Sequence, residues 1–522
     1  MKSVMHHQFS QIPSATIPRS VFNRTHGHKT TFDASYLVPF YVDEALPGDT
    51  FHLKASIFAR LATPIAPIMD NLHMETFFFA VPVRLLWDNW QKFNGEQDNP
   101  TDSIDYLVPT ITSPAGGWTQ GSLEDYFGLP TGVAGIEVCS FWHRAYNLIY
   151  NEWFRDQNLQ DSVNVPKGDG PDLQSDYTLL RRNKRHDYFT SCLPWPQKGP
   201  GVELPLGTTA PVIPNPVNPE PSFFIGTNPT GVNLSGLRGT DSAGWTGVPV
   251  VDGIAAWSVP NLVTDLSHAA SATINSLRQA FQIQKLLERD ARGGTRYTEI
   301  LKSHFSVISP DARLQRPEYL GGSYAPVNIN AVAQTSGSGD YTGTPQGNLA
   351  AFGTVSKSFN GFHKSFTEHM VIIGLVNVRA DLTYQQGLRR MWSRQTRYDF
   401  YWPALANIGE QAVLNKEIFC DGSPADEEVF GYQERWAEYR YFPSIITGLF
   451  RSNNATPLDY WHLSQEFTTR PLLNSTFKQE NVPIDRIIAV PAEPHFIFDS
   501  HIQLKCARPM PVYSVPGLID HF

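Results

Sequence analysis

Strand-like segments gather at the two ends of this chain, and this arrangement restricts the folds that it can adopt. Residues 32–82 are rich in aromatic and β-branched side chains and are divided by proline-marked turns, which predicts strands. Residues 363–384, 428–450 and 495–512 carry similar patterns near the other end. In an antiparallel sandwich with long insertions, the ends of the chain come together to build the sheets. The sequence therefore predicts a mainly β fold, an antiparallel sandwich with helix and loop insertions.

Two of these segments also show which side chains they bury. Phe77, Phe78 and Phe79 follow one another without alternation, which is typical of a strand that is buried on both faces. In residues 495–512 the apolar side chains alternate with polar ones, so one face of that strand should point to the core.

The clearest helix lies within residues 268–301. Ile274, Leu277 and Phe281 fall on one side of a helical wheel. Gly293 and Gly294 should end the helix, because glycine accepts the left-handed conformation at a helix C-terminus. Helical spacing also occurs over residues 83–93 and 140–157.

The composition favours a protein that is largely covered by other subunits. Charged residues make up only 17% of the 522 residues, whereas aromatic residues reach 12%. Interfaces favour aromatic rings and arginine over lysine and glutamate. The net charge of −9 argues against a chain that wraps nucleic acid by itself, because such proteins are normally basic. Any nucleic-acid contact must be local or be shared with a separate basic partner.

The cysteines and the N-terminus bear on where the chain is made. Its four cysteines, Cys139, Cys192, Cys420 and Cys506, lie far apart without metal-ligand spacing, as expected of free thiols in a reducing cytoplasm. The N-terminus lacks the apolar segment of a signal peptide, and no apolar run approaches the ~20 residues of a membrane span. We therefore expect a soluble protein made in a cytoplasm, with no membrane insertion.

Residues 194–262 form a long excursion that an ordinary loop does not explain. The segment is rich in proline and poor in charge, and it contains Phe223, Phe224 and Trp245. A structureless loop of this length inside a compact domain is rare unless it is functional, and a disordered linker would carry more charge. Two interpretations stay open: a segment that gains order by packing on copies of itself, and a flexible linker between two domains.

Motifs of the common enzyme classes are missing from the chain. It contains no G-x-x-x-x-G-K-[ST], no G-x-G-x-x-G and no H-E-x-x-H. The acidic loop 421–428 lacks the spacing of a calcium-binding loop and predicts a solvated turn. We therefore expect no enzyme, no cofactor and no metal site. Carboxylate pairs for glycoside hydrolysis are set by geometry and not by spacing, so a carbohydrate-active or carbohydrate-binding β-sandwich protein stays open as the alternative.

Clusters of basic residues are the candidate contact sites. One cluster holds Arg389, Arg390, Arg394 and Arg397 among Trp392, Tyr398, Tyr401 and Trp402. Arginines among aromatic rings suit single-stranded nucleic acid, which needs cations for phosphate and flat rings for base stacking. They are also typical of subunit interfaces. The same two interpretations apply to a second cluster, Arg181, Arg182, Lys184 and Arg185.

The N-terminal segment, residues 1–31, is polar and irregular. It predicts either an arm that crosses a neighbouring subunit or a loosely ordered tail. Arg19, Arg24 and Lys29 are its candidate contact residues.

Several stretches resemble one viral protein family. They are RSVFNRTHGHKTTFDASYLVPFYVDEALPGDTF (19–51), FARLATPIAPIMDNLHMETFFFAVP (58–82), WDNWQKFNGEQ (87–97), RRNKRHDYFTSCLPWPQKG (181–199), TINSLRQAFQIQKLLERDARGGTRYTEIL (273–301) and RLQRPEYLGGS (313–323). Together they resemble the major capsid proteins of the Microviridae, in the gokushovirus branch of small icosahedral single-stranded DNA bacteriophages. The match runs in order over most of the chain and is weakest over 200–262.

This resemblance implies an eight-stranded antiparallel jelly-roll sandwich with long insertions, and a single capsid domain over residues 1–522. It implies a T=1 icosahedral shell around circular single-stranded DNA, closed by five-, three- and two-fold contacts between copies. It also implies that residues 198–262, with Phe223, Phe224 and Trp245, form a protrusion at the three-fold axes that attaches to the host.

The partners implied by the resemblance are further copies of the chain, viral single-stranded DNA, a small basic DNA-binding protein, a scaffolding protein during assembly and a host surface receptor. The protein is then a component of the virion capsid that assembles in the cytoplasm of a bacterial host. Its function is structural, with no catalysis.

Overall fold

The computed structural model describes residues 18–202, 274–307, 315–335 and 346–513, together with six short strands between residues 212 and 264. Its contacts divide the chain into two compact units, Met1–Pro196 with Val307–Phe522, and Gln197–Ser306. The first unit holds the large sheets and the basic clusters. The second unit holds most of the long excursion and the helix that follows it.

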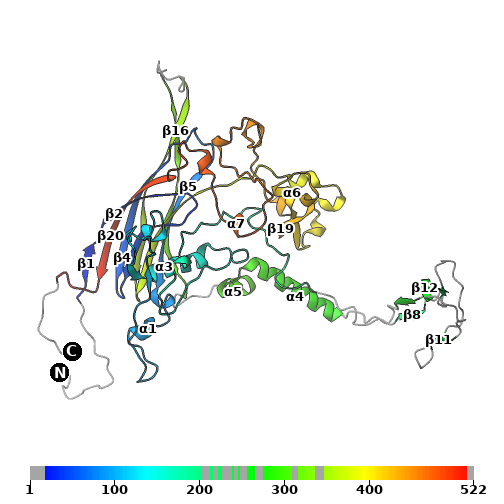
Figure 1. Cartoon of the computed structure of the whole chain (residues 1–522), viewed down its shortest axis with the longest axis horizontal. Helices are drawn as coiled ribbons and strands as arrows, with labels where there is room; N and C mark the ends of the chain where they lie inside the picture. The colour runs from blue at the N-terminus through cyan, green and yellow to red at the C-terminus, as the bar shows by residue number, and fades with distance from the viewer. Residues whose placement is uncertain are drawn as a thin grey trace. The chain divides into compact units, whose positions relative to one another are not determined.

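A six-stranded antiparallel sheet combines strands from both ends of the chain (Figure 1). Its strands are β1 (Ser20–Asn23), β2 (His26–Phe32), β20 (Phe496–Arg508), β4 (Thr50–Leu61), β16 (Leu349–Ser365) and β15 (Asn328–Ala333). The C-terminal strand β20 lies between β4 on one side and β1 and β2 on the other. Along β4 every second side chain from Phe51 to Leu61 is buried. The prediction that the chain ends build the sheets is confirmed.

A four-stranded antiparallel sheet forms the second layer. Its order is β14 (Glu318–Pro326), β5 (Leu72–Pro82), β17 (Met370–Ala380) and β3 (Val38–Ala45). Every residue of β17 is buried, and so are Phe78 and Phe79 of β5. The prediction of a strand buried on both faces is therefore confirmed for β5.

Aromatic rings fill the space between the two sheets. The ring of Phe78 lies 5.6 Å from that of Phe362 on β16, and the ring of Phe40 on β3 lies 5.7 Å from that of Phe498 on β20. Such ring pairs add about 0.5–1.5 kcal/mol each beyond the burial of their area. The sheets thus share one core, and the expected mainly β fold with antiparallel sheets and long insertions is confirmed.

The outer face of the four-stranded sheet is covered by residues 83–180. Helix α3 (Phe141–Ile149) runs into a π-helical turn, Tyr150–Phe154, and packs on β5 and β17. The smaller elements here are η1 (Val83–Leu85), α1 (Trp90–Phe93), β6 (Thr110–Thr112), α2 (Leu123–Tyr126), β7 (Glu137–Cys139) and η3 (Gln174–Asp176). The helix predicted over 140–157 is present over Phe141–Phe154, whereas the one predicted over 83–93 is broken into η1 and the single turn α1.

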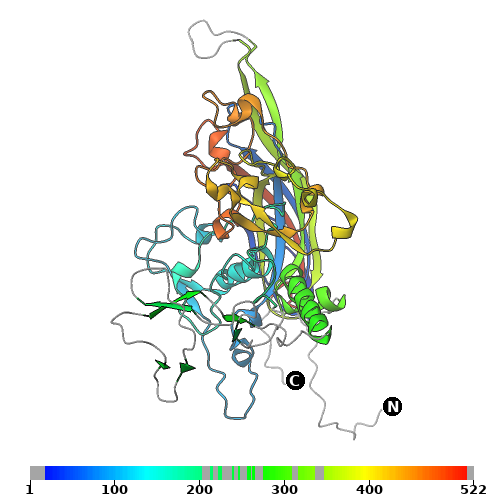
Figure 2. The same cartoon turned by 90° about the vertical axis from the view of Figure 1, so that its right-hand side faces the viewer.

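Residues 381–495 form a loop-rich layer in front of the strands in Figure 2, where they are yellow to orange. Its elements are η4 (Arg390–Ser393), η5 (Arg397–Asp399), η6 (Pro403–Leu405), β18 (Glu410–Leu414), α6 (Asn415–Ile418), η7 (Pro424–Glu427), β19 (Val429–Glu434), η8 (Ala437–Tyr439), η9 (Gly448–Phe450), η10 (Asp459–Trp461), α7 (Ser475–Lys478) and η11 (Ile484–Arg486). The strand predicted over 428–450 extends only to Glu434, because Trp436 adopts a left-handed backbone with φ of 72°.

Two further segments differ from the sequence-based expectations. Residues 20–32, the second half of the expected N-terminal arm, form β1 and β2 and pair with β20. Residues 349–365, for which no strand was predicted, form β16, the longest strand among the described residues. One face of β16 carries serine, threonine and asparagine, so its apolar pattern is weak although its backbone pairs fully.

The second unit contains a nested β-hairpin and two helices. Strand β8 (Val212–Pro214) pairs with β13 (Leu262–Thr264), β9 (Ser222–Ile225) with β12 (Ala255–Val259), and β10 (Arg238–Gly239) with β11 (Trp245–Thr246). The side chains of Phe223, Phe224 and Trp245 lie outside the described residues. Helix α4 (Ile274–Gly293) ends at the predicted glycines, with φ of 91° at Gly294, and α5 (Tyr297–Phe305) follows. No helix in the described part of the chain is long and apolar enough to cross a membrane.

Candidate functional site

A third apolar cluster holds the arginine-rich segment in place. It consists of Tyr188, Phe189, Cys192, Val413, Ile418, Phe430 and Phe477. The hairpin of β18 and β19, with α6 between its strands, supplies Val413, Ile418 and Phe430 to this cluster. The segment 387–402 lies against this hairpin through its arginines.

Arg390 is tied to the hairpin by its charge. Its guanidinium lies 2.9 Å from the carboxylate of Glu417 and donates a hydrogen bond of 2.7 Å to the carbonyl oxygen of Ala412. Glu417 is buried and also accepts a hydrogen bond of 3.0 Å from the hydroxyl of Tyr188. Burial raises the pKa of the Glu417 carboxyl. Arg390 therefore has a structural role, because Glu417 offsets its charge.

The other arginines of this segment differ in their partners. Arg394 lies 3.6 Å from the carboxylate of Glu438 and stacks on Tyr439, whereas Arg389 and Arg397 stack on Phe442 and Trp402 at 4.0 and 4.7 Å from the ring centres. Arg389 and Arg397 form no ion pair with any described residue. Two of the four charges are thus neutralised within the chain, and the other two rest on rings.

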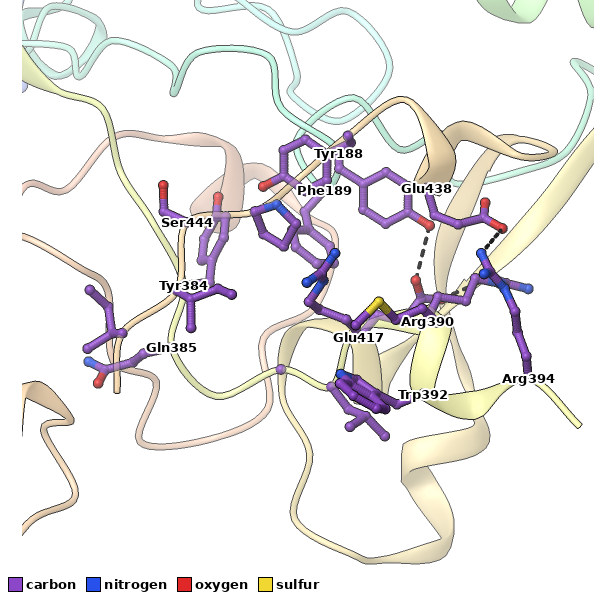
Figure 3. A pocket seen from close by; sticks show the side chains of 18 of the residues that line it. Tyr188, Phe189, Tyr384, Gln385, Arg390, Trp392, Arg394, Glu417, Glu438 and Ser444 are labelled. Atoms are coloured by element: carbon purple, nitrogen blue, oxygen red, sulfur yellow. Dashed lines mark hydrogen bonds and ion pairs between the residues drawn. The ribbon is translucent and has the colours of Figure 1, made fainter. Parts of the chain in front are cut away.

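A pocket of about 330 Å³ opens beside these arginines (Figure 3). Tyr188, Phe189 and Tyr384 line it with their rings, and Arg389 and Arg390 line it with their guanidinium groups. Figure 3 shows Glu417 receiving both Tyr188 and Arg390, while Arg394 turns to Glu438. Beside the pocket, Glu417 and Glu438 thus offset the charges of Arg390 and Arg394, whereas Arg389 stacks on Phe442.

Large apolar side chains are exposed around this pocket. Trp392 is 69% exposed and Phe442 is 70% exposed. The other exposed members of this surface are Met391, Tyr398, Phe400, Tyr401, Trp402, Tyr439, Ile445 and Leu449. We call these ten residues the aromatic surface. A monomeric protein rarely exposes a large contiguous apolar patch, and such patches mark interaction sites.

The second basic cluster is mostly used inside the fold. Arg182 lies 2.6 Å from the carboxylate of Glu75, and Arg185 lies 2.7 Å from that of Asp381. Lys184 is buried, which lowers its pKa to about 8, and its ammonium lies 4.1 Å from the ring centre of Phe477. Arg181 stacks on Tyr36 at 4.4 Å and donates to the side chain of Asn481. This cluster ties the loop-rich layer to the sheets, and only Arg185 keeps substantial exposure.

Glu480, beside this cluster, makes a testable link between pH and stability. Its side chain is fully buried and lies 4.0 Å from Arg379, and burial raises its pKa to about 7. The Glu480 carboxyl therefore binds a proton more tightly in the folded chain than in the unfolded chain. The stability gained from this proton is complete below the pKa of the unfolded chain, and it is lost as the pH rises through 7. Between pH 5 and pH 8 the loss should be on the order of 2–3 kcal/mol.

The Glu480→Gln variant should lack this dependence. The free energy of unfolding is measured in urea for this variant and for the unmodified chain. The variant's value minus that of the unmodified chain should rise by about that amount between pH 5 and pH 8. Glu427→Gln, at an exposed acid paired with Lys416, is the control and should show no such gain. An equal pH response of the two variants would contradict the assignment.

The N-terminal candidates lie at the edge of the six-stranded sheet. Arg24 makes two hydrogen bonds of 2.8 Å to the buried carboxylate of Asp43, and Arg19 donates to the hydroxyl of Thr50 at 2.8 Å. Lys29 is exposed and lies 3.1 Å from Asp499. Arg24 thus fastens β1 and β2 to the four-stranded sheet, and Lys29 points outward.

Sequence reasoning did not single out Phe442, Tyr439, Glu417 or Glu438. The aromatic run Tyr439–Phe442 was present as a signal but was assigned to a strand. The described residues contain no group of histidine, cysteine and acidic side chains that could hold a metal ion.

Comparison with known proteins gives consistent matches along the whole chain. The family described as "Capsid protein (F protein)" matches residues 10–518. A capsid protein VP1 of Bdellovibrio phage phiMH2K is 53% identical over 99% of this chain and 98% of its own length. Capsid proteins VP1 of Chlamydia phage 1 and Spiroplasma virus 4 are 46% and 39% identical, over 99% and 98% of this chain and 98% and 97% of their own lengths.

Proposed function

Because this chain belongs to the capsid protein (F protein) family, we propose that its copies assemble into a T=1 icosahedral shell that encloses circular single-stranded DNA. The chain is a structural component of the virion capsid and not an enzyme, which sets aside the carbohydrate-active alternative. The resemblance to the Microviridae capsid proteins is confirmed.

The aromatic surface is the observation that carries the proposal. Its ten side chains are exposed on a loop-rich layer whose arginines are already paired or stacked. The fully buried core of an interface is rich in aromatic residues, methionine and arginine. A second copy would cover these rings and remove their apolar area from water, at about 25 cal/mol per Å². We therefore assign Arg389 and Arg397 to contacts between copies, and Arg394, paired with Glu438, to the support of this surface.

The strand order supports a jelly roll. One sheet has the order β2, β20, β4, β16 and the other β14, β5, β17, β3. Successive strands β2 to β5 alternate between the two sheets, and so do β14, β16, β17 and β20. This is the alternation of an eight-stranded double Greek key, in which two four-stranded sheets pack face to face.

The domain assignments are part of the same proposal. We assign residues 1–522 to one capsid domain, with residues 1–31 as an N-terminal arm whose second half is anchored on β20. We assign residues 198–262 to a protrusion at the three-fold axes that attaches to a host receptor. In support, the strands within 212–264 pair only with one another. The net charge of −9 favours help from a small basic DNA-binding protein, and a scaffolding protein is a further proposed partner during assembly.

The test of the proposal is the size of the particles that the expressed chain forms. Light scattering and negative-stain microscopy should show closed shells of a single size. Chains that stay monomeric, or that form only irregular aggregates under every condition in which the subunit is folded, would contradict the proposal.

A further inference from the structure

The outer face of the six-stranded sheet is basic, and most of its described outward side chains are exposed. In Figure 1 strands β2, β20 and β4 form one flank of the first unit, and α3, α6 and α7 lie on the other. The outward side chains of β4 and β20 are exposed at almost every second position. The basic side chains on this face are Lys29, His52, Lys54, Arg60, His363, His501 and Lys505. Asp499 is the only acidic side chain that the described strands place on it.

Several of these basic side chains meet across the strands. Lys505 of β20, His52 of β4 and His363 of β16 are neighbours in register, and the two histidine rings stack at 3.8 Å. The next outward row holds Gln503, Lys54 and Asn360. Residues in register lie about 5 Å apart between strands, and successive rows lie about 7 Å apart along a strand. The side chains of these rows therefore place several hydrogen-bond donors close together on the sheet face.

Three of the cations on this face have no counter-charge. Lys54, Arg60 and Lys505 make no side-chain hydrogen bond or ion pair with any residue that the structure describes, whereas Lys29 lies 3.1 Å from Asp499. This differs from the segment around Arg390 and Arg394, whose charges are offset by Glu417 and Glu438. On a chain with a net charge of −9, these three uncompensated cations make the sheet face locally basic, so that it can attract a polyanion.

Exposed rings lie among these cations. Phe58 is 48% exposed and lies in register with Asp499 and Ser356, one row from Arg60. Phe352 on β16 is 38% exposed on the same face, one row beyond Thr354. Cations that contact phosphate and rings that stack on bases are the two features that sequence-tolerant single-strand binders combine.

We propose that this sheet face binds single-stranded DNA on the inside of the shell. Phosphates contact Lys54, Arg60 and Lys505, and unpaired bases stack on Phe58 and Phe352. The inference deepens the proposed function and rests on it, because it places this face toward the enclosed genome. The alternative occupant is an acidic surface of a second copy. The mixture of unpaired cations and exposed rings favours single-stranded DNA, and cross-linking distinguishes the two.

The experiment compares two triple variants of the full-length chain. Lys54→Gln, Arg60→Gln and Lys505→Gln together remove the free cations of the sheet face. Lys92→Gln, Lys167→Gln and Arg440→Gln together remove the same charge from positions outside it. Binding of a fluorescein-labelled deoxythymidine oligonucleotide is measured from 50 to 300 mM salt. Each phosphate contact that is lost lowers the slope of log affinity against log salt concentration by ~0.7. The magnitude of this slope should therefore fall by about 2 in the sheet-face variant and stay unchanged in the control.

Equal slopes in the two variants would overturn the proposal. Ultraviolet cross-linking of the unmodified chain to the same oligonucleotide tests it without any substitution. Adducts on peptides of β4, β16 and β20 are expected. Adducts found only on other peptides would also overturn the proposal. An acidic protein that covers this face in the particle would overturn it as well. Shells that form while the slopes stay equal would overturn only the sheet-face assignment. Failure of the unmodified chain to form any shell would instead overturn the proposed function.

Discussion

Replacing Arg144 by methionine should destabilise the folded subunit by about 3–5 kcal/mol, because it leaves a buried carboxylate without its counter-charge. Arg144 lies on α3 and is fully buried. Its guanidinium donates to Asp172 at 2.7 Å and to the carbonyl oxygens of Leu86 and Gly168 at 2.9 and 3.0 Å. Arg144 on α3 thus joins two further segments of the layer that covers the four-stranded sheet, one at Leu86 and one at Gly168–Asp172. Urea unfolding of the subunit measures the loss.

Two further variants identify the cause. Adding Asp172→Asn to Arg144→Met removes the stranded charge and should restore part of the stability. Arg440→Met, at an exposed ion pair with Glu434 of 2.8 Å, should cost no more than about 1 kcal/mol. If the Arg144 and Arg440 variants lost similar stability, the buried network would not have the role assigned to it.

Replacing Trp392 and Phe442 together by alanine should abolish shell formation while leaving a folded subunit. Both side chains are more than two-thirds exposed in the isolated chain, so their removal takes little from its core. In an interface such rings are the residues whose loss costs 2 kcal/mol or more each, and a closed shell repeats the loss at every equivalent contact. Sedimentation should show the double variant only as small species, with an unfolding midpoint close to that of the unmodified subunit.

The matched control removes exposed apolar side chains from outside the aromatic surface. Leu107 is 84% exposed and Leu173 is 68% exposed, both on loops of the insertion over residues 83–180. The Leu107→Ala and Leu173→Ala double variant should still form shells. Shells from the Trp392 and Phe442 variant would show that the aromatic surface does not hold copies together.

The sequence predicts the strands whose burial is visible as a pattern of apolar side chains. β20 alternates at Ile502, Leu504 and Cys506, and β5 shows the uninterrupted rings of a strand buried on both faces. β16 was missed because its outward side chains from Thr354 to Asn360 are small and polar, and Gly353 and Gly361 interrupt its inward row. The same polar face later proved to be part of the basic sheet surface. A strand that binds a polar ligand thus lacks the apolar pattern that would reveal it.

The candidate site shows a second limit of sequence reasoning. Arg182 and Arg185 looked like free cations because their partners, Glu75 and Asp381, lie more than a hundred residues away. Arg390 and Arg394 are likewise paired with acids that lie further along the chain, Glu417 in α6 and Glu438 in η8. Charge clusters are visible in a sequence, but their neutralisation depends on tertiary contacts. Only the structure separates the paired arginines from Lys54, Arg60 and Lys505.

The most direct test of the account is an image reconstruction of the assembled particle. It should show a closed shell with one copy in each asymmetric unit, and a mass of roughly 3.5 MDa for about sixty copies of the 58.5 kDa chain. Trp392 and Phe442 should be buried between copies, and the outer face of β4 and β20 should line the interior. A shell in which these rings face solvent, or in which that sheet face points outward, would contradict the account.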